Sequence, residues 1–161
     1  MTYGDFYLTR ETWKDLIEGT GMIAIIASLV LVAYEVRQNT LMMRAQTRDS
    51  LTEKQMTMTS WISTNEFAAN LIPLGARGEL EPGSPESIAF DQLLTGMMRE
   101  WENSLYQYEQ GLFDASEFNA RMQAWSGFVT QPGVRSFWTR RKENFSPNFR
   151  SEIERIIADS E

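Results

Sequence analysis

The sequence contains no cysteine and no histidine among its 161 residues. Without cysteine the chain forms no disulfide and offers no thiol nucleophile or thiolate ligand. Without histidine it lacks the commonest general base and the commonest transition-metal ligand. These two absences exclude Ser-His-Asp and Cys-His catalytic sites within one chain, the usual zinc sites, and di-iron sites built on Glu-x-x-His pairs.

The sequence also lacks a glycine-rich phosphate-binding loop and a strongly basic composition. No glycine pattern of either common nucleotide-binding type is present. The formal net charge of −7 argues against general nucleic-acid binding, because neutralising phosphates requires clustered Lys and Arg. We therefore expect no catalytic residues, no metal site, no cofactor and no nucleic-acid partner. Carboxylate, tyrosine, serine or lysine chemistry stays open, without a recognisable signature.

One apolar run, residues 21–36, dominates the N-terminal part of the chain. The uncharged stretch 19–34 has about 16 residues and a helical length of roughly 24 Å, short of the roughly 30 Å hydrocarbon core. Counting 16–36 gives about 21 residues and roughly 31 Å, which is long enough. Trp13 and Tyr34 flank this stretch as an interfacial aromatic belt would. The sequence predicts a single-pass transmembrane helix, and the alternative is a buried helix of a soluble bundle.

Small residues recur along one face of this helix. Gly21, Ala24 and Ser28 are spaced by three and four residues, and Leu31 and Glu35 continue the same face. Bulky aliphatic side chains cover the rest of the helix. Stripes of small residues allow helices to approach closely inside a bilayer. We expect these five residues to form a packing interface with another membrane protein subunit or with a second copy of the chain.

Charges around the apolar run give an orientation. Arg10 and Lys14 precede it, whereas Arg37, Arg44 and Arg48 follow it within a similar distance. The positive-inside rule therefore favours a cytoplasmic C-terminal part, by one charge. The N-terminal region is not basic and no small-residue cleavage site follows cleanly, so a secretory signal is not expected.

The run SLVLVAYEVRQNT resembles a recurrent pattern in an uncharacterised group of small bacterial helical proteins. In that group an apolar N-terminal helix ends in Gln or Glu, then Val or Ile, then Arg-Gln-Asn-Thr. The runs YQYEQGLFD, PGVRSFW and FSPNFR are similar to the same group. The resemblance implies a helical protein and, with a transmembrane helix, a bacterial inner-membrane location. It implies no catalytic residue, since no known function comes with it.

The remaining sequence predicts an all-α fold. We expect an N-terminal amphipathic segment and apolar helix over residues 1–36 and a helical head domain over residues 37–161. Residues 37–64 contain no Gly or Pro and continue the helix with a thin apolar face. Pro73 and Gly75 predict a loop after a short helix.

Capping residues, prolines and a glycine punctuate the later helices. Helices are expected to start at Ser84–Pro85, at the capping box Asp114–Glu117, at Pro132 and at Ser146–Pro147, and the first of them to stop at Gly111. The expected core positions are Phe90, Leu94, Met97, Trp101, Leu105, Tyr108, Phe118, Met122, Trp125, Val129, Val134, Phe137, Trp138, Phe149, Ile153, Ile156 and Ile157.

Two polar constellations are candidates for function. The first is basic and would contact anionic lipid or an acidic partner; it comprises Arg140, Arg141, Lys142 and Arg150. Trp13 and Tyr34 are further candidate contacts with lipid or a partner. The other gathers carboxylates and phenols on one helix, namely Arg99, Glu100, Glu102, Tyr106, Tyr108 and Glu109. An exposed, solvated helix face explains the second cluster better than a metal or proton-transfer site, because no ligand set is recognisable.

Three functions compete at this point. The first is a non-catalytic, membrane-anchored helical interaction protein, an accessory or structural subunit of a larger membrane complex. The second is a soluble helical homo-oligomer that buries residues 21–36 between subunits. The third is an enzyme that uses the carboxylate and tyrosine cluster, which requires Glu102 and Tyr106 to converge in a cleft.

Overall fold

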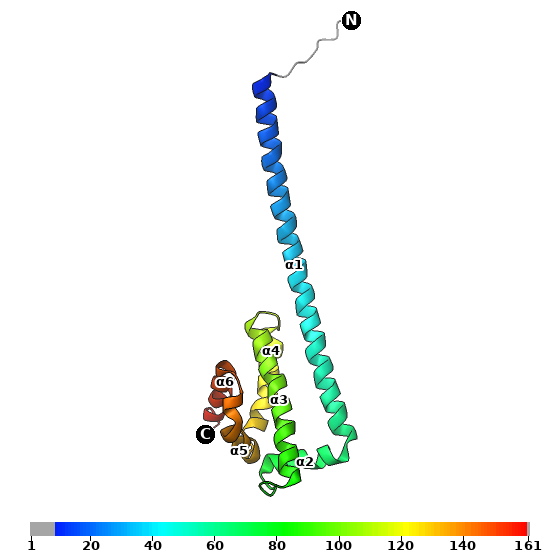
Figure 1. Ribbon diagram of the computed structural model, residues 1–161, viewed down its shortest axis with the longest axis vertical. Helices are drawn as coiled ribbons and strands as arrows, with labels where there is room; N and C mark the ends of the chain where they lie inside the picture. Colours follow the sequence, from blue (N-terminus) through cyan, green and yellow to red (C-terminus); the bar gives the residue numbers. More distant parts are fainter. Residues whose placement is uncertain (1–8, 161) are drawn as a thin grey trace. The chain divides into compact units, whose positions relative to one another are not determined.

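The computed structural model describes residues 9–160, and over these residues every regular element is a helix. The prediction of an all-α fold is confirmed. The elements are α1 (Arg10–Thr64), α2 (Glu66–Arg77), α3 (Pro85–Glu109), α4 (Ala115–Val129), α5 (Pro132–Arg141), the 3-10 turn η1 (Lys142–Asn144) and α6 (Pro147–Ala158) (Figure 1). The first eight residues of the predicted N-terminal segment lie outside the described residues.

The chain divides into two compact units between Met43 and Arg44. The first unit contains the N-terminal part of α1. The second unit, which we call the bundle, contains the rest of α1 together with α2 to α6. The predicted boundary after Val36 lies where the apolar run ends, whereas the boundary after Met43 separates two compact units. At the start of the bundle, α1 is bonded to the turn between α3 and α4. There Arg44 Nε donates to the carbonyl of Gly111 at 2.9 Å.

Helix α1 begins and ends at side chains that satisfy free backbone groups. Thr9 Oγ1 accepts from the N–H of Thr12 at 3.4 Å at the start. The helix then continues through residues 37–64, as the absence of Gly and Pro there predicts. At Asn65 the backbone is extended, and its side chain accepts from the N–H of Ala68 at 3.1 Å. This cap starts α2 only two residues after α1 ends.

The sequence prediction is wrong for Pro73 and Gly75, which lie inside α2 and not in a loop. Proline removes one helical hydrogen bond, but tertiary burial of Ala68 and Leu71 holds the amphipathic helix in place. Glycine at position 75 leaves room for the buried ring of Phe90, because an added Cβ would lie 2.4 Å from that ring and displace it. The helix ends instead at Gly78, which has a φ of 78°.

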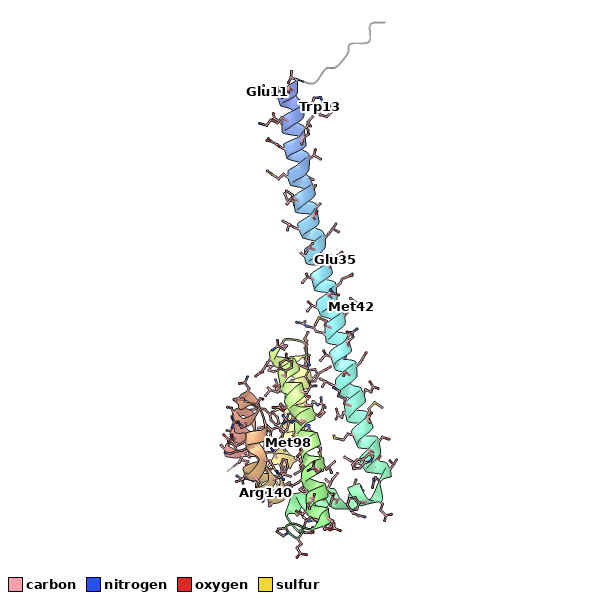
Figure 2. The ribbon with its side chains drawn as sticks, viewed as in Figure 1. Glu11, Trp13, Glu35, Met42, Met98 and Arg140 are labelled. Carbon is pink, nitrogen blue, oxygen red and sulfur yellow. The ribbon has the colours of Figure 1, made fainter. Side chains whose placement is uncertain are left out.

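The later helices start at the predicted positions, and their apolar faces form one core. Trp101 stacks on Trp125 with ring centroids 4.9 Å apart and meets Phe149 edge-on at 5.6 Å. Its indole N–H donates to the sulfur of Met122 at 2.9 Å. Met98, labelled in Figure 2, is fully buried on the same helix. Of the expected core residues, Tyr108 is exposed, while Trp125 and Ile157 are half-buried.

Helices α2 and α5 approach each other backbone to backbone. A Cβ at Gly133 would lie 1.8 Å from the carbonyl oxygen of Gly75, so only glycine fits there. This contact places the start of α5 against the end of α2.

Candidate functional site

The strongest functional feature is the uncovered apolar surface of α1. Residues 10–39 are all exposed in the structure. Their side chains stand outward around the helix (Figure 2). Ile23 is 69% exposed and Ile25 is 64% exposed, although isoleucine is normally buried. Apolar surface of this extent marks a membrane or protein contact.

By length and composition, α1 qualifies as a membrane-spanning helix. None of the 18 consecutive residues that form its most apolar stretch is buried inside the structure. The core helix of a soluble protein and a signal sequence near the N-terminus pass the same length and composition test, but a core helix is mostly buried. The coarse prediction, one long apolar helix near the N-terminus that could span a membrane, is therefore supported.

The predicted packing face of α1 is open in the structure. A Cβ at Gly21 would meet no atom within 4 Å. The hydroxyl of Ser28 donates to the carbonyl of Ala24 at 2.8 Å, so the face holds no unsatisfied hydroxyl donor. Leu31 and Glu35 are also exposed. The face is thus small and sterically accessible, and its role in packing stays a prediction.

The two aromatic residues predicted to lie at the membrane interfaces are also exposed. Trp13 is 55% exposed and Tyr34 is 59% exposed. The side-chain amide of Gln38 donates to the Tyr34 hydroxyl at 2.7 Å, which gives the phenol a polar neighbour at one end of the apolar run. An amphipathic ring with a polar tip suits a membrane interface, and this role also stays a prediction.

Every member of the predicted basic cluster has a carboxylate partner. The ion pairs are Arg140 and Arg141 with Asp91, Lys142 with Glu154, and Arg150 with Glu143. Figure 2 labels Arg140 on α5. The hydrogen bond and the charge of Glu154 raise the pKa of Lys142 above its ordinary value. Because neighbouring carboxylates offset these charges, the cluster attracts an anionic surface less than the sequence alone predicts.

Glu102 and Tyr106 line one cleft, as the enzyme alternative requires. The cleft has a volume of about 650 Å³ and lies between α3 and the start of α6. However, both oxygens of Glu102 are already occupied. Its Oε1 accepts from the backbone N–H of Ser146 at 2.6 Å, and its Oε2 accepts from Arg99 at 2.6 Å.

The environment of Glu102 holds it ionised. Burial opposes its charge, but hydrogen bonds from Ser146 and Arg99 outweigh burial and lower its pKa below the ordinary value. The expectation of a solvated face holds for the exposed residues Arg99, Tyr106, Tyr108 and Glu109. It is wrong for Glu102, whose side chain is only 16% exposed, and for Glu100, at 10%. Glu102 satisfies the backbone N–H of Ser146, the N-cap residue of α6, and the Ser146 side chain makes no capping hydrogen bond of its own. A carboxylate fixed in this way is poorly suited to proton transfer.

Sequence reasoning missed a buried ion pair between α3 and α4. Arg121 Nη2 lies 2.8 Å from a carboxylate oxygen of Glu100, and each side chain is 10% exposed. Arg121 also donates to the hydroxyl of the fully buried Ser104 at 3.0 Å. The signal in the sequence is weak: Glu100 lies three residues after Met97 and so borders the apolar stripe of α3.

Among residues 9–160, no group of three or more acidic residues is placed to hold a metal ion. Comparison of the chain with protein-family models, with curated proteins and with solved structures finds no match. The candidate site therefore rests on the structure alone, and its principal feature is the exposed apolar part of α1.

Proposed function

We propose that the protein is a non-catalytic, membrane-anchored helical interaction protein, an accessory or structural subunit of a larger membrane complex. The observation that carries this proposal is the exposed apolar surface between Trp13 and Val36. Eight large aliphatic side chains lie exposed within 22–32: Met22, Ile23, Ile25, Ile26, Leu29, Val30, Leu31 and Val32. At about 1.5–3 kcal/mol each, removing them from water is worth at most roughly 12–24 kcal/mol.

That free energy exceeds the net stability of most domains, so the segment is expected to be covered in the cell. A bilayer covers it more simply than a single second helix does. Ala24 and Ser28 lie on one face, whereas Ile26 and Val30 lie on the opposite face. One partner helix in water would cover one face only, while lipid surrounds the whole circumference.

The small face then supplies the contact with another subunit. In a bilayer the hydrophobic effect does not drive helix association, so close approach over small residues is the main attraction. Gly21, Ala24 and Ser28 offer such an approach, and Glu35 would lie at the cytoplasmic end of the same face. The partners are other membrane protein subunits or a second copy of this chain, and the location is a bacterial inner membrane with the bundle in the cytoplasm.

Membrane fractionation of the tagged full-length chain tests the proposal. We expect the protein to stay in the membrane pellet through a carbonate wash and to leave it only with mild detergent. Mass spectrometry of the extracted material should then identify co-purifying subunits. Recovery of the intact chain in the soluble fraction, as an oligomer, would instead support burial of residues 21–36 between subunits.

A matched pair of variants assigns the result to the apolar run. Ile26→Lys with Leu29→Lys should release the protein from carbonate-washed membranes. Met42→Lys with Met56→Lys adds the same charge to exposed residues outside the run and should leave the protein in the pellet. The N-terminal sequence of the membrane form provides a further check, because a cleaved signal would remove the apolar run.

A further inference from the structure

We propose that residues 44–62 of α1, which we call the strap, can leave the remainder of the bundle while α2 to α6 stay folded. This inference goes beyond the proposed function and does not depend on membrane insertion. It assigns a conformational device to the bundle: a helix that is either docked on α4 and the turn before it or released from them.

The strap has one fully buried apolar side chain within its described range. Leu51 is the one buried residue of α1 within its described range, at 2% exposure, and Met58 is half-buried against the same core. By contrast, the 25-residue α3 buries Phe90, Leu94, Met97, Met98, Trp101, Ser104 and Leu105. Elements with few buried apolar contacts open at lower free energy than the core to which they attach.

The strap also makes polar contacts, which lie on the same face as Leu51. Arg44 Nε donates to the carbonyl of Gly111 at 2.9 Å, and Arg48 pairs with Glu117 at 2.9 Å. Gln55 accepts from Arg121 at 3.4 Å, which is long for a hydrogen bond. The side chain of Arg48 is 67% exposed, so salt screens its attraction to Glu117.

Apart from Leu51, every fully buried apolar residue of the described core lies after α1. The most extensive helix packing joins α2 with α5 and α3, and α4 with α6 and α3. The Glu100–Arg121 pair stays between α3 and α4 when the strap leaves. One extended residue, Asn65, separates α1 from α2 and provides a hinge.

Release would have two consequences. The 19 residues of the strap would add roughly 28 Å of helix to the connection between the apolar run and the remaining bundle. Release would also uncover Arg121 and the apolar surface on which Leu51 packs. A partner could select either state, because the two states present different surfaces.

Distance measurements between spin labels test the proposal. The chain has no cysteine, so two introduced cysteines carry the only labels. Met56→Cys with Gln123→Cys places one label on the strap and one on α4, both at exposed positions. Gln123→Cys with Ser151→Cys places both labels on α4 and α6 as the control. All measurements use the full chain in detergent.

We expect two distance populations for the strap pair and one for the control pair. Raising salt from about 0.01 M to about 1 M shortens the Debye length from about 30 Å to about 3 Å and should enlarge the longer-distance population at least threefold. Arg48→Gln should have a similar effect at low salt. Lys54→Gln removes the same charge from a strap residue with no ion pair to the described part of the bundle and should have little effect.

Leu51→Ala truncates the one fully buried side chain of the strap and should make the released state the major one, with the control distance unchanged. The proposal is overturned if the strap pair keeps one distance at both salt concentrations and in the Leu51→Ala variant. It is equally overturned if the control distance broadens whenever the strap distance does, because the strap and the remaining bundle would then open as one unit.

Discussion

At Gly133 the absence of a side chain decides whether α2 and α5 can pack. A methyl group there would overlap the carbonyl oxygen of Gly75 at 1.8 Å, and neither backbone can move without disturbing a helix. We expect Gly133→Ala to destabilise the bundle by about 3 kcal/mol or more, as severe overpacking does. Chemical denaturation of the detergent-solubilised chain measures this loss.

Gly127 provides the matched control for this substitution. It lies inside α4, and a Cβ at this position would meet no atom within 4 Å. Gly127→Ala should therefore stabilise the bundle by about 0.5–1 kcal/mol through helix propensity. Equal effects of the two substitutions would contradict the backbone contact between α2 and α5.

For the buried pair of Glu100 and Arg121, removing one partner should destabilise the bundle more than removing both. Arg121→Met leaves the Glu100 carboxylate buried without its partner and should cost about 3–5 kcal/mol. The double change Glu100→Leu with Arg121→Met removes both charges and should recover most of that stability. Chemical denaturation of both variants distinguishes the two cases.

An exposed pair gives the comparison for the buried one. Arg155 has a 58% exposed side chain and pairs with Glu152 and Asp159 on the surface of α6. Arg155→Met should cost no more than about 1 kcal/mol, because water and salt already screen such pairs. A loss as large as that of Arg121→Met would show that burial is not the cause.

The lowered pKa of Glu102 predicts a pH dependence of stability. Its ionised form is stabilised in the folded state, so the contribution is present above the unfolded pKa, about 4.3, and is lost as pH falls through the lower folded value. At about pH 7 the wild type should be more stable than Glu102→Gln. The difference should shrink as the pH is lowered below about 4. Urea denaturation across this range tests the sign, and a constant difference would argue against the Ser146 and Arg99 hydrogen bonds as its source.

At the scale of the element, α1 joins two different kinds of helix in one continuous structure. Residues 10–39 are exposed and largely apolar, whereas residues 44–62 carry charged contacts around Leu51. No Gly or Pro interrupts the helix after Gly21, so backbone propensity continues across the change in side-chain character. Side chains, and not a break in the backbone, therefore distinguish the apolar part from the strap.

The packing face of the apolar part predicts a position-dependent effect of one substitution. Ala24→Leu adds bulk to the small face, whereas Ala33→Leu adds the same bulk on nearly the opposite side. If the small face contacts another subunit, Ala24→Leu should reduce co-purification at least severalfold and Ala33→Leu should not. Comparable recovery with both variants would place the contact elsewhere.

At the scale of the whole molecule, the buried core and the exposed apolar surface lie in different parts of the chain. The buried residues lie in the bundle, while the large exposed aliphatic residues concentrate before residue 37. A chain beginning at Thr40 should therefore be recovered as a soluble, folded helical protein, since it keeps the bundle and loses the apolar run. Sedimentation and circular dichroism measure this outcome, and aggregation of the shortened chain would show that the apolar run also covers bundle surface.

Several features of the fold follow from local sequence. Helix starts at Ser84–Pro85 and Pro132 and the stop at Gly111 depend on capping chemistry within a few residues, and the structure places them there. The apolar stripe from Phe90 to Leu105 likewise depends only on helical spacing, and its members are buried.

Contacts between distant residues could not be predicted in this way. Pro73 and Gly75 remain helical because α2 packs on α3 and α5, which local propensity does not report. Glu102 accepts from the N-cap residue of a helix that begins more than forty residues later, as its bond to Ser146 shows. The partner of Glu100 is Arg121 on another helix, and no local pattern links the two.

The sequence by itself determined the helical class, the absence of cysteine and histidine chemistry, and the presence of one apolar run long enough to span a membrane. Composition and the spacing of apolar residues depend on the sequence alone, so both are known without the fold. Only the tertiary structure decided which charges are buried, which carboxylate accepts from the N-cap residue of α6, and that Leu51 is the one fully buried residue in the described part of α1. These depend on which helices meet, and that is set by packing of the whole core.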